Sequence, residues 1–452
     1  MTHRSLLTLV ACSLLFVCPA SAQSWEQDAA AAFAKAEELA AKGQYAAALA
    51  AYKKIAETWP ATLGGSRSLW RSGLNSLLGW RFLVQSGPPE NRVDVVIMGD
   101  GFTLEQQNSF DDIAKNVQRT FDKEKVLGEY YPYWNFVSCN VVSKEDGIDG
   151  YGRQYDTALG GHVVDIGRAL VGVDANLVRR MLKELPAHDG VAIVFVKKGS
   201  GGTAGGGVAT VGGRDDDTMV HEWGHAFGGL GDEYVDRTHR GEGRQGINTA
   251  NTGDKAKVPW KHWIDAGAPG IGVYEGANGM QRGAWRPTAS GCIMQQSNGQ
   301  FCRVCREGLV LHIYERVDPI ESVTPAPAKD ALPCRESLLF QAKVMQPRKH
   351  PLDVRWYVFA DGKAPAEPRG PLRGDAGQRS ARGPLVAISD VPAAVGVREF
   401  RFDPRGRKPG RYCLVLRVKD TTRMGDDGLP WVLKDDRGLC ESERRWWISV
   451  KE

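Results

Sequence analysis

Apolar positions in the middle of the chain alternate between two periods. Some recur in short continuous runs, which are typical of buried strands, and others recur at helical spacing, which is typical of amphipathic helices. The predicted elements are strands at 93–98, 135–142 and 191–196, and helices at 110–121 and 173–185. Strands that alternate with helices indicate a mixed α/β domain, which we place at residues 86–318.

An alanine-rich stretch precedes this domain. Residues 25–59 predict two antiparallel helices with a tight turn at Gly43, and they resemble one tetratricopeptide-type unit. One such unit cannot bury its own apolar face, so we expect this helical segment, residues 23–85, to dock on the α/β domain. A further helix is expected around Leu69–Leu78. A peptide-binding repeat array is the alternative, although the sequence contains one repeat.

The pattern changes again after Asp318. Val323–Ala328 reads as a stiff linker rich in proline and alanine, and short strands follow between turns rich in glycine and proline. These strands are predicted at 338–344, 354–359, 411–418 and 445–450. The spacing predicts an immunoglobulin-like β-sandwich over residues 319–452, a module that usually binds or braces.

Composition narrows the class of protein. Of the 452 residues, 42% are hydrophobic and 25% are charged, which is typical of a folded globular chain and argues against disorder. Lysine and arginine number 58 against 54 acidic residues, and the charges are interspersed. We therefore expect no nucleic-acid partner, and the sequence does not indicate an oligomeric state.

The first residues predict export. His3 and Arg4 precede an apolar stretch at 6–17, and the small residues Ala20 and Ala22 follow. This is the pattern of a secretory signal peptide over residues 1–22, cleaved after Ala22, so a secreted or periplasmic protein is expected. A membrane anchor is the weaker alternative, because the apolar stretch falls short of the ~20 residues that span a bilayer. No later segment predicts a membrane span.

The candidate chemistry lies in one motif, His221-Glu222-Trp223-Gly224-His225. Residues four apart lie on one face of a helix, so both imidazoles can reach a single metal ion. Glu222 projects ~100° round the helix, beside a metal-bound water. Because Zn²⁺ lowers the pKa of bound water toward ~7, Glu222 is expected to be the general base that takes its proton. The motif predicts one catalytic zinc ion and hydrolysis of peptide bonds.

The residues after this helix offer a third ligand. The glycines at 228, 229 and 231 should end the helix after His225 and let the chain turn back. A catalytic zinc takes three protein ligands and leaves one position for water. Asp232 is the first choice and Glu233 the alternative, since spacing alone does not separate adjacent carboxylates. The aspartates at 215–217 are expected to cap the helix.

His221–Tyr234 resembles the active-site segment of the IgA-peptidase-type family of secreted zinc metalloendopeptidases. Residues 95–103, 274–287 and 291–305 resemble the opening strand, a later segment and the closing methionine-containing turn of that family, so the likeness extends over about 92–314. The resemblance implies a metzincin-like fold, a protein or peptide substrate, and Met294 in a hydrophobic turn beneath the metal. Better-known metzincins carry a third histidine where this chain has Gly231. Some also place a tyrosine where it has Gln296.

Glycines at 199–207 raise a second possibility. Gly199–Ala204 superficially matches a dinucleotide fingerprint, but more glycines follow it in place of the required helix. We expect a glycine-rich rim leading into an edge strand at Val208–Val211. There Gly207, Val208 and Ala209 would pair with an extended peptide substrate. An ordinary mobile loop is the alternative.

The sequence contains nine cysteines. Cys12 and Cys18 lie in the predicted signal peptide, so seven remain after cleavage. In an exported chain Cys413 and Cys440, within the predicted sandwich, are candidates for a disulfide, although the sequence does not fix the connectivity. Cys292, Cys302 and Cys305 could bind a second zinc, but with three thiols and an oxidising setting disulfides are favoured there. The sequence as a whole predicts an exported zinc endopeptidase. The competing class is a non-catalytic secreted binding or adhesion protein on a metallopeptidase scaffold.

Overall fold

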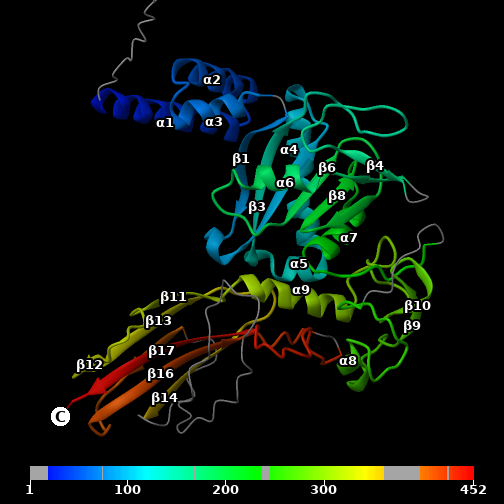
Figure 1. Cartoon of the computed structure of the whole chain (residues 1–452). Coiled ribbons are helices and arrows are strands. Elements are labelled where there is room, and N and C mark those ends of the chain that lie inside the picture. Colours follow the sequence, from blue (N-terminus) through cyan, green and yellow to red (C-terminus); the bar gives the residue numbers. More distant parts are fainter. Residues whose placement is uncertain are drawn as a thin grey trace, which may run out of the picture.

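The structure is a computed structural model, and it describes residues 19–73, 75–165, 169–236, 245–360, 398–424 and 427–451 (Figure 1). The signal peptide expected over residues 1–22 lies outside these ranges, apart from the helical backbone of residues 19–22. None of the helices in the described ranges has the length and apolar character that crossing a bilayer requires.

The amino-terminal helices form a hairpin with a third helix beside it. They are α1 (Pro19–Ala41), α2 (Tyr45–Thr58) and α3 (Leu63–Arg71). Phe33 and Tyr52 pack together and share a core with Leu78 and Val142 of the central sheet, so the helices dock on the α/β domain as expected. The helix expected around Leu69–Leu78 is only partly present, because the chain turns at Asn75 with a φ of 60° and a strand begins.

A six-stranded sheet forms the centre of the molecule, in the order β1-β3-β2-β6-β8-β7. Its strands are β1 (Ser76–Gln85), β2 (Val93–Asp100), β3 (Trp134–Val142), β6 (Ala192–Val196), β7 (Gly202–Gly205) and β8 (Val208–Gly212). The four inner strands run parallel, and β1 and β7 close the two edges as antiparallel strands. The three predicted strands of the α/β domain are confirmed as β2, β3 and β6. The segment expected to be helical, 23–85, also supplies the edge strand β1.

Helices cover both faces of this sheet. The side chains of β2 alternate between the two faces, and each set packs into its own core. Val95 and Ile97 pack with α4 (Gln107–Lys123), α7 (Asp216–Ala226) and α9 (Arg303–Arg316). Val96 and Met98 pack with α6 (Ala175–Leu182) on the opposite face. The predicted helices at 110–121 and 173–185 correspond to α4 and α6.

Shorter elements connect these layers. They are η1 (Pro89–Asn91), η2 (Leu104–Gln106), α5 (Lys125–Glu129), η3 (Tyr131–Tyr133), β4 (His162–Asp165), β5 (Ala169–Gly172), α8 (Lys261–Asp265), β9 (Tyr274–Ala277) and β10 (Met280–Arg286). The hairpin of β4 and β5 lies next to the β7 edge, where Thr203 Oγ1 donates to the Val171 carbonyl over 2.8 Å.

Two further sheets make up the carboxyl-terminal part. One contains β11 (Ile320–Thr324), β13 (Leu338–Val344) and β15 (Glu399–Phe402). The other contains β12 (Leu332–Cys334), β14 (Asp353–Ala360), β16 (Gly410–Lys419) and β17 (Glu441–Val450). Phe340, Trp356, Phe402 and Trp446 bring both sheets into one core. The expected linker at 323–328 overlaps the end of β11, which runs to Thr324. The immunoglobulin-like topology of this part remains a prediction.

A buried polar cluster joins this part to the α/β domain, and α9 lies between the two in Figure 1. Asp420 Oδ2 accepts hydrogen bonds from Tyr130 at 2.6 Å and from Tyr314 at 2.8 Å. His350 lies between two carboxylates, with Nε2 2.8 Å from Asp420 and Nδ1 2.8 Å from Glu129. The interface therefore contains a histidine held by acidic groups from both sides.

Candidate metal centre

Helix α7 carries the motif and starts and ends as its sequence predicts. Asp215 is the N-cap residue, and its carboxylate accepts from Thr218 N at 3.0 Å. The helix ends at Ala226, and Gly229 then takes a φ of 60°, a left-handed conformation that glycine adopts readily. The chain reverses there, so the segment after the helix returns to its carboxyl-terminal end.

This reversal brings three ligand atoms together. Nε2 of His221 and Nε2 of His225 lie 3.0 Å apart, and Asp232 Oδ1 lies 3.1 Å from each of them. Zinc bonds of about 2.0–2.1 Å to nitrogen and oxygen place tetrahedral ligands about 3.3 Å apart. The three atoms therefore fit one face of a zinc coordination shell.

The two imidazoles are oriented by backbone carbonyls. Nδ1 of His221 lies 2.9 Å from the Ile293 carbonyl, and Nδ1 of His225 lies 2.6 Å from the Leu230 carbonyl. A carbonyl can only accept, so each Nδ1 carries the hydrogen and each Nε2 keeps its lone pair for a metal. Both imidazoles are thus held in the tautomer that a metal ligand needs.

The electrostatics of this cluster favour a positive charge. Burial opposes protonation of His225, but hydrogen bonding and charge attraction from Asp232 outweigh it and raise the His225 pKa to about 9. Burial alone would raise the pKa of Asp232, yet the hydrogen bonds to His221 and His225 keep it well below its usual value. An anionic carboxylate beside two imidazoles attracts a cation, whether a proton or a divalent metal.

Glu222 lies at the wall of a cleft next to the three atoms. The cleft has a volume of about 400 Å³, and Gly201, Gly202, His221, Glu222 and Tyr234 contribute to its lining. The side chain of Glu222 is 6% exposed. A Cβ atom added at Gly202 would come within 2.8 Å of Glu222 Oε1, so strand β7 lies directly against this carboxylate.

A turn at Cys292–Gln296 packs against α7. Met294 is fully buried, and its sulfur lies where a side chain at Gly224 of the helix would begin, 2.7 Å from an added Cβ. The same turn offers the Ile293 carbonyl to His221 and the Met294 carbonyl to Glu233 N, the latter at 2.8 Å. The methionine is therefore packed against the motif helix, in agreement with the expectation of a hydrophobic turn there.

Glu233, the alternative third ligand, faces away from the histidines. Its Oε1 lies 3.0 Å from Cys305 Sγ, 3.5 Å from Cys292 Sγ and 3.7 Å from Cys302 Sγ. Burial, and next the charge of Cys302, raise its pKa to about 8. The two adjacent carboxylates thus belong to different clusters, and Asp232 is the one next to the imidazoles.

The family model of IgA peptidase M64 matches residues 82–270 and 262–313 of the chain. Together these segments cover just over half of the sequence and include the histidine motif, Asp232 and the methionine turn. The chain belongs to the IgA peptidase M64 family. Membership supports hydrolysis of peptide bonds as the class of activity and a protein or peptide as the substrate. No curated protein matches the sequence.

The edge-strand prediction for this M64 peptidase is wrong. Strand β8 pairs with β6 on one side and β7 on the other, so Val208 and Ala209 are buried and their backbone groups are used within the sheet. Gly207 lies at the far end of this strand and does not line the cleft. The edge belongs to β7, because the chain doubles back at Gly206-Gly207 before β8 and adds one more strand.

Cys413 and Cys440, the candidate disulfide pair, are both free cysteines. No disulfide joins any of the cysteines in the described residues. In the cysteine cluster, the sulfurs of Cys292 and Cys305 lie 3.8 Å apart, whereas a disulfide bond is about 2.05 Å long.

Three residues near the site were not anticipated from the sequence. Gly202 touches Glu222, Asn248 donates to the Gly231 carbonyl at 2.8 Å and to Glu233 Oε1 at 3.0 Å, and Thr288 donates to Glu233 Oε2 at 2.9 Å. Asn248 and Thr288 lie outside the named helices and strands, where no periodicity marks them. Only the return of the chain toward α7 brings them to the site.

Proposed function

We propose that this member of the M64 family is an exported, zinc-dependent endopeptidase of metzincin-like fold. His221, His225 and Asp232 would bind one catalytic Zn²⁺, and Glu222 would act as the general base. The observation that carries the proposal is the convergence of two imidazole nitrogens and one carboxylate oxygen within 3.1 Å of one another. Three protein ligands with an adjoining cleft are typical of a catalytic zinc site.

The mechanism assigns separate tasks to the chain and to the metal. When bound, zinc would acidify a water molecule and polarise the scissile carbonyl. Glu222 accepts the proton of the attacking water and later passes it to the leaving amine nitrogen. Its contact with Gly202 restricts the carboxylate to the cleft wall, and the carbonyls of Ile293 and Leu230 keep both imidazoles oriented.

Substrate binding is proposed at the cleft end of the β7 edge, since the β4–β5 hairpin packs beside this edge at Thr203. An edge strand presents backbone N–H and C=O groups that an extended peptide can pair with, and the end of β7 at Gly202 lies at the cleft beside Glu222. Tyr234 also lines the cleft, with its ring 6.1 Å from the ring of His221. We assign its hydroxyl to stabilising the negative charge that develops on the carbonyl oxygen.

A non-catalytic binding or adhesion protein would have the same fold, so the test must measure metal and hydrolysis together. Purified protein is analysed for zinc and incubated with a mixed protein substrate, with and without a chelator, and after zinc is restored. The proposal predicts cleavage that the chelator abolishes and zinc restores. His221→Ala should lose cleavage, whereas the exposed control His188→Ala should retain it. Zinc-loaded protein that cleaves no peptide bond would favour the binding protein.

Export is part of the proposal and rests on residues 1–22. Expression in a secreting bacterial host, followed by amino-terminal sequencing of the exported protein, should give Gln23 as the first residue. Protein that stays in the cytoplasm with residues 1–22 attached would contradict export without affecting the enzyme.

A further inference from the structure

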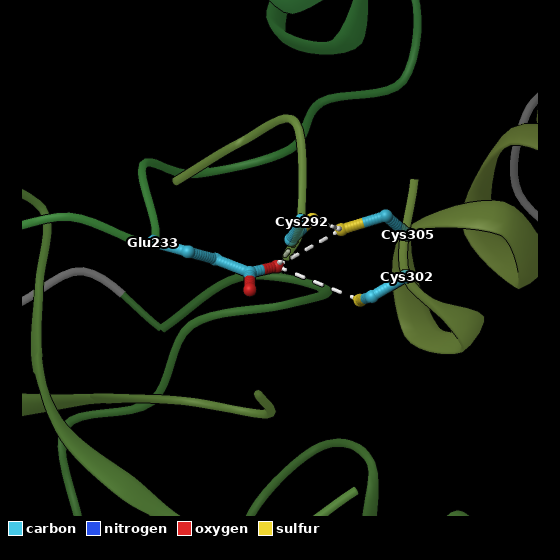
Figure 2. Close-up of side chains that lie close together, drawn as sticks. All are labelled: Glu233, Cys292, Cys302 and Cys305. Carbon is cyan, nitrogen blue, oxygen red and sulfur yellow. Dashed lines mark hydrogen bonds between the residues drawn. The ribbon is translucent and has the colours of Figure 1, made fainter. Parts of the chain in front are cut away.

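A second cluster of ligand atoms lies next to the proposed catalytic centre, and it combines residues from three segments (Figure 2). Glu233 follows α7, Cys292 belongs to the methionine turn, and Cys302 and Cys305 lie at the start of α9, where Cys302 is the N-cap residue. Figure 2 shows the three sulfurs directed at one carboxylate oxygen of Glu233. All four ligand atoms lie within 4.8 Å of one another.

The spacing of these atoms matches a tetrahedral zinc site. Zinc bonds of about 2.3 Å to sulfur and about 2.1 Å to oxygen place two sulfurs about 3.8 Å apart and a sulfur and an oxygen about 3.6 Å apart. Cys292 Sγ and Cys305 Sγ are 3.8 Å apart, and Glu233 Oε1 lies 3.0–3.7 Å from the three sulfurs. A disulfide would require one pair to close to about 2.05 Å.

The surroundings of Glu233 resemble those of a structural metal ligand. The residue is 0% exposed. Arg286 interacts with it electrostatically, but among the described residues no Lys, Arg or His forms a direct ion pair with it. Asn248 and Thr288 donate hydrogen bonds to its two oxygens, which orients the carboxyl group toward the thiols. A buried carboxyl group beside three thiols therefore lacks a directly bonded cation among the described residues, and a metal ion would supply one.

We propose that Glu233, Cys292, Cys302 and Cys305 bind a second zinc ion with a structural role. Thiolates are ligands that zinc prefers, and four protein ligands leave no position for water. The ion would connect the segment after α7, the methionine turn and α9. Through these connections it would hold Asp232, the neighbour of Glu233, and the Ile293 carbonyl that orients His221.

The decisive experiment separates the two metal sites. Zinc is measured in the unaltered protein, in the double variant His221→Ala/His225→Ala and in Cys305→Ser, each purified with zinc present. The proposal predicts two zinc ions per chain in the unaltered protein, one in the double histidine variant and at most one in Cys305→Ser. Cys334→Ala, in β12 of the carboxyl-terminal part, is the matched cysteine control and should retain both ions.

Cobalt replacement identifies the ligands even if Cys305→Ser fails to fold. The double histidine variant loaded with Co²⁺ should show the intense near-ultraviolet absorption of cobalt bound to thiolate. Absence of metal from that variant would overturn the proposal, and so would a disulfide among Cys292, Cys302 and Cys305 found by thiol mapping of the exported protein. If only the catalytic proposal fails, the double histidine variant still holds its ion and the unaltered protein holds no other.

Discussion

Asp232 and Glu233 are adjacent in sequence, but their carboxylates belong to two different clusters. Asp232 Oδ1 lies 3.1 Å from both histidine Nε2 atoms, and Glu233 Oε1 lies 3.0 Å from Cys305 Sγ. The segment after α7 thus presents one carboxylate to each cluster from neighbouring residues. Any shift of this peptide therefore alters both clusters at once.

Glu222→Gln tests the general base. The amide keeps the size of the side chain but cannot accept a proton, so kcat should fall by about 10²–10⁴-fold while bound zinc is unchanged. Peptide hydrolysis and metal analysis measure the two effects. Glu57→Gln, an exposed glutamate of α2, is the matched control and should leave both values unaltered. Normal activity in Glu222→Gln would refute the mechanism.

Gly202→Ala tests the contact between β7 and Glu222. The added Cβ would lie 2.7 Å from Glu222 Cγ and 2.6 Å from the Thr210 carbonyl oxygen, so Glu222, the β7 backbone or both must shift. Misplacement of a catalytic group by about 1 Å can reduce the rate about 10²-fold, and we expect a kcat loss of that order with zinc retained. The control is Gly205→Ala in the same strand, where an added Cβ meets no atom within 4 Å. Equal activity of the two variants would contradict the assignment.

Tyr234→Phe tests the proposed stabilisation of the oxyanion. Loss of one hydrogen-bond donor to that charge typically lowers kcat by about 10²–10³-fold, and KM should change little because the ring remains. Tyr151→Phe, at a residue that is 84% exposed, should behave like the unaltered protein. A change in KM alone would instead indicate that Tyr234 only contacts the substrate.

The stability of the protein should depend on pH through His350. Burial lowers the pKa of this histidine, but hydrogen bonds and charges from Asp420 and Glu129 outweigh burial and raise it. A raised folded-state pKa stabilises the protein fully below the unfolded value of about 6.5, and the contribution is lost as the pH rises through the folded value. The pKa of Asp420 is lowered in the folded protein. Its contribution to stability is therefore lost as the pH falls and the carboxylate becomes protonated.

His350→Gln tests this expectation. The substitution should lower the free energy of unfolding by about 2 kcal/mol at about pH 6, the effect of losing hydrogen bonds to charged groups, and by less at about pH 9. Urea unfolding at both values measures the difference, and His188→Gln serves as the exposed control. A destabilisation that is the same at both values would show that His350 contributes by packing alone.

Several features could be predicted from the sequence because their causes are local. Apolar periodicity predicted β2, β3, β6, α4 and α6, and the spacing of His221 and His225 predicted that both imidazoles share one face of α7. Asp215 caps the start of this helix, and Gly229, with its left-handed φ, makes the turn that follows its end. Each of these features depends on residues within a few positions of one another.

Only the tertiary structure decided the rest, because it depends on the path of the chain between distant segments. The sequence left Asp232 and Glu233 as alternatives, and it missed that Glu233 would meet cysteines about 60–70 positions away. It also placed the sheet edge at β8, since nothing in a short apolar run reveals that β7 adds a further strand. The spacing of side chains along a helix follows from backbone geometry alone. The direction in which Asp232 and Glu233 point is decided only when the whole core packs.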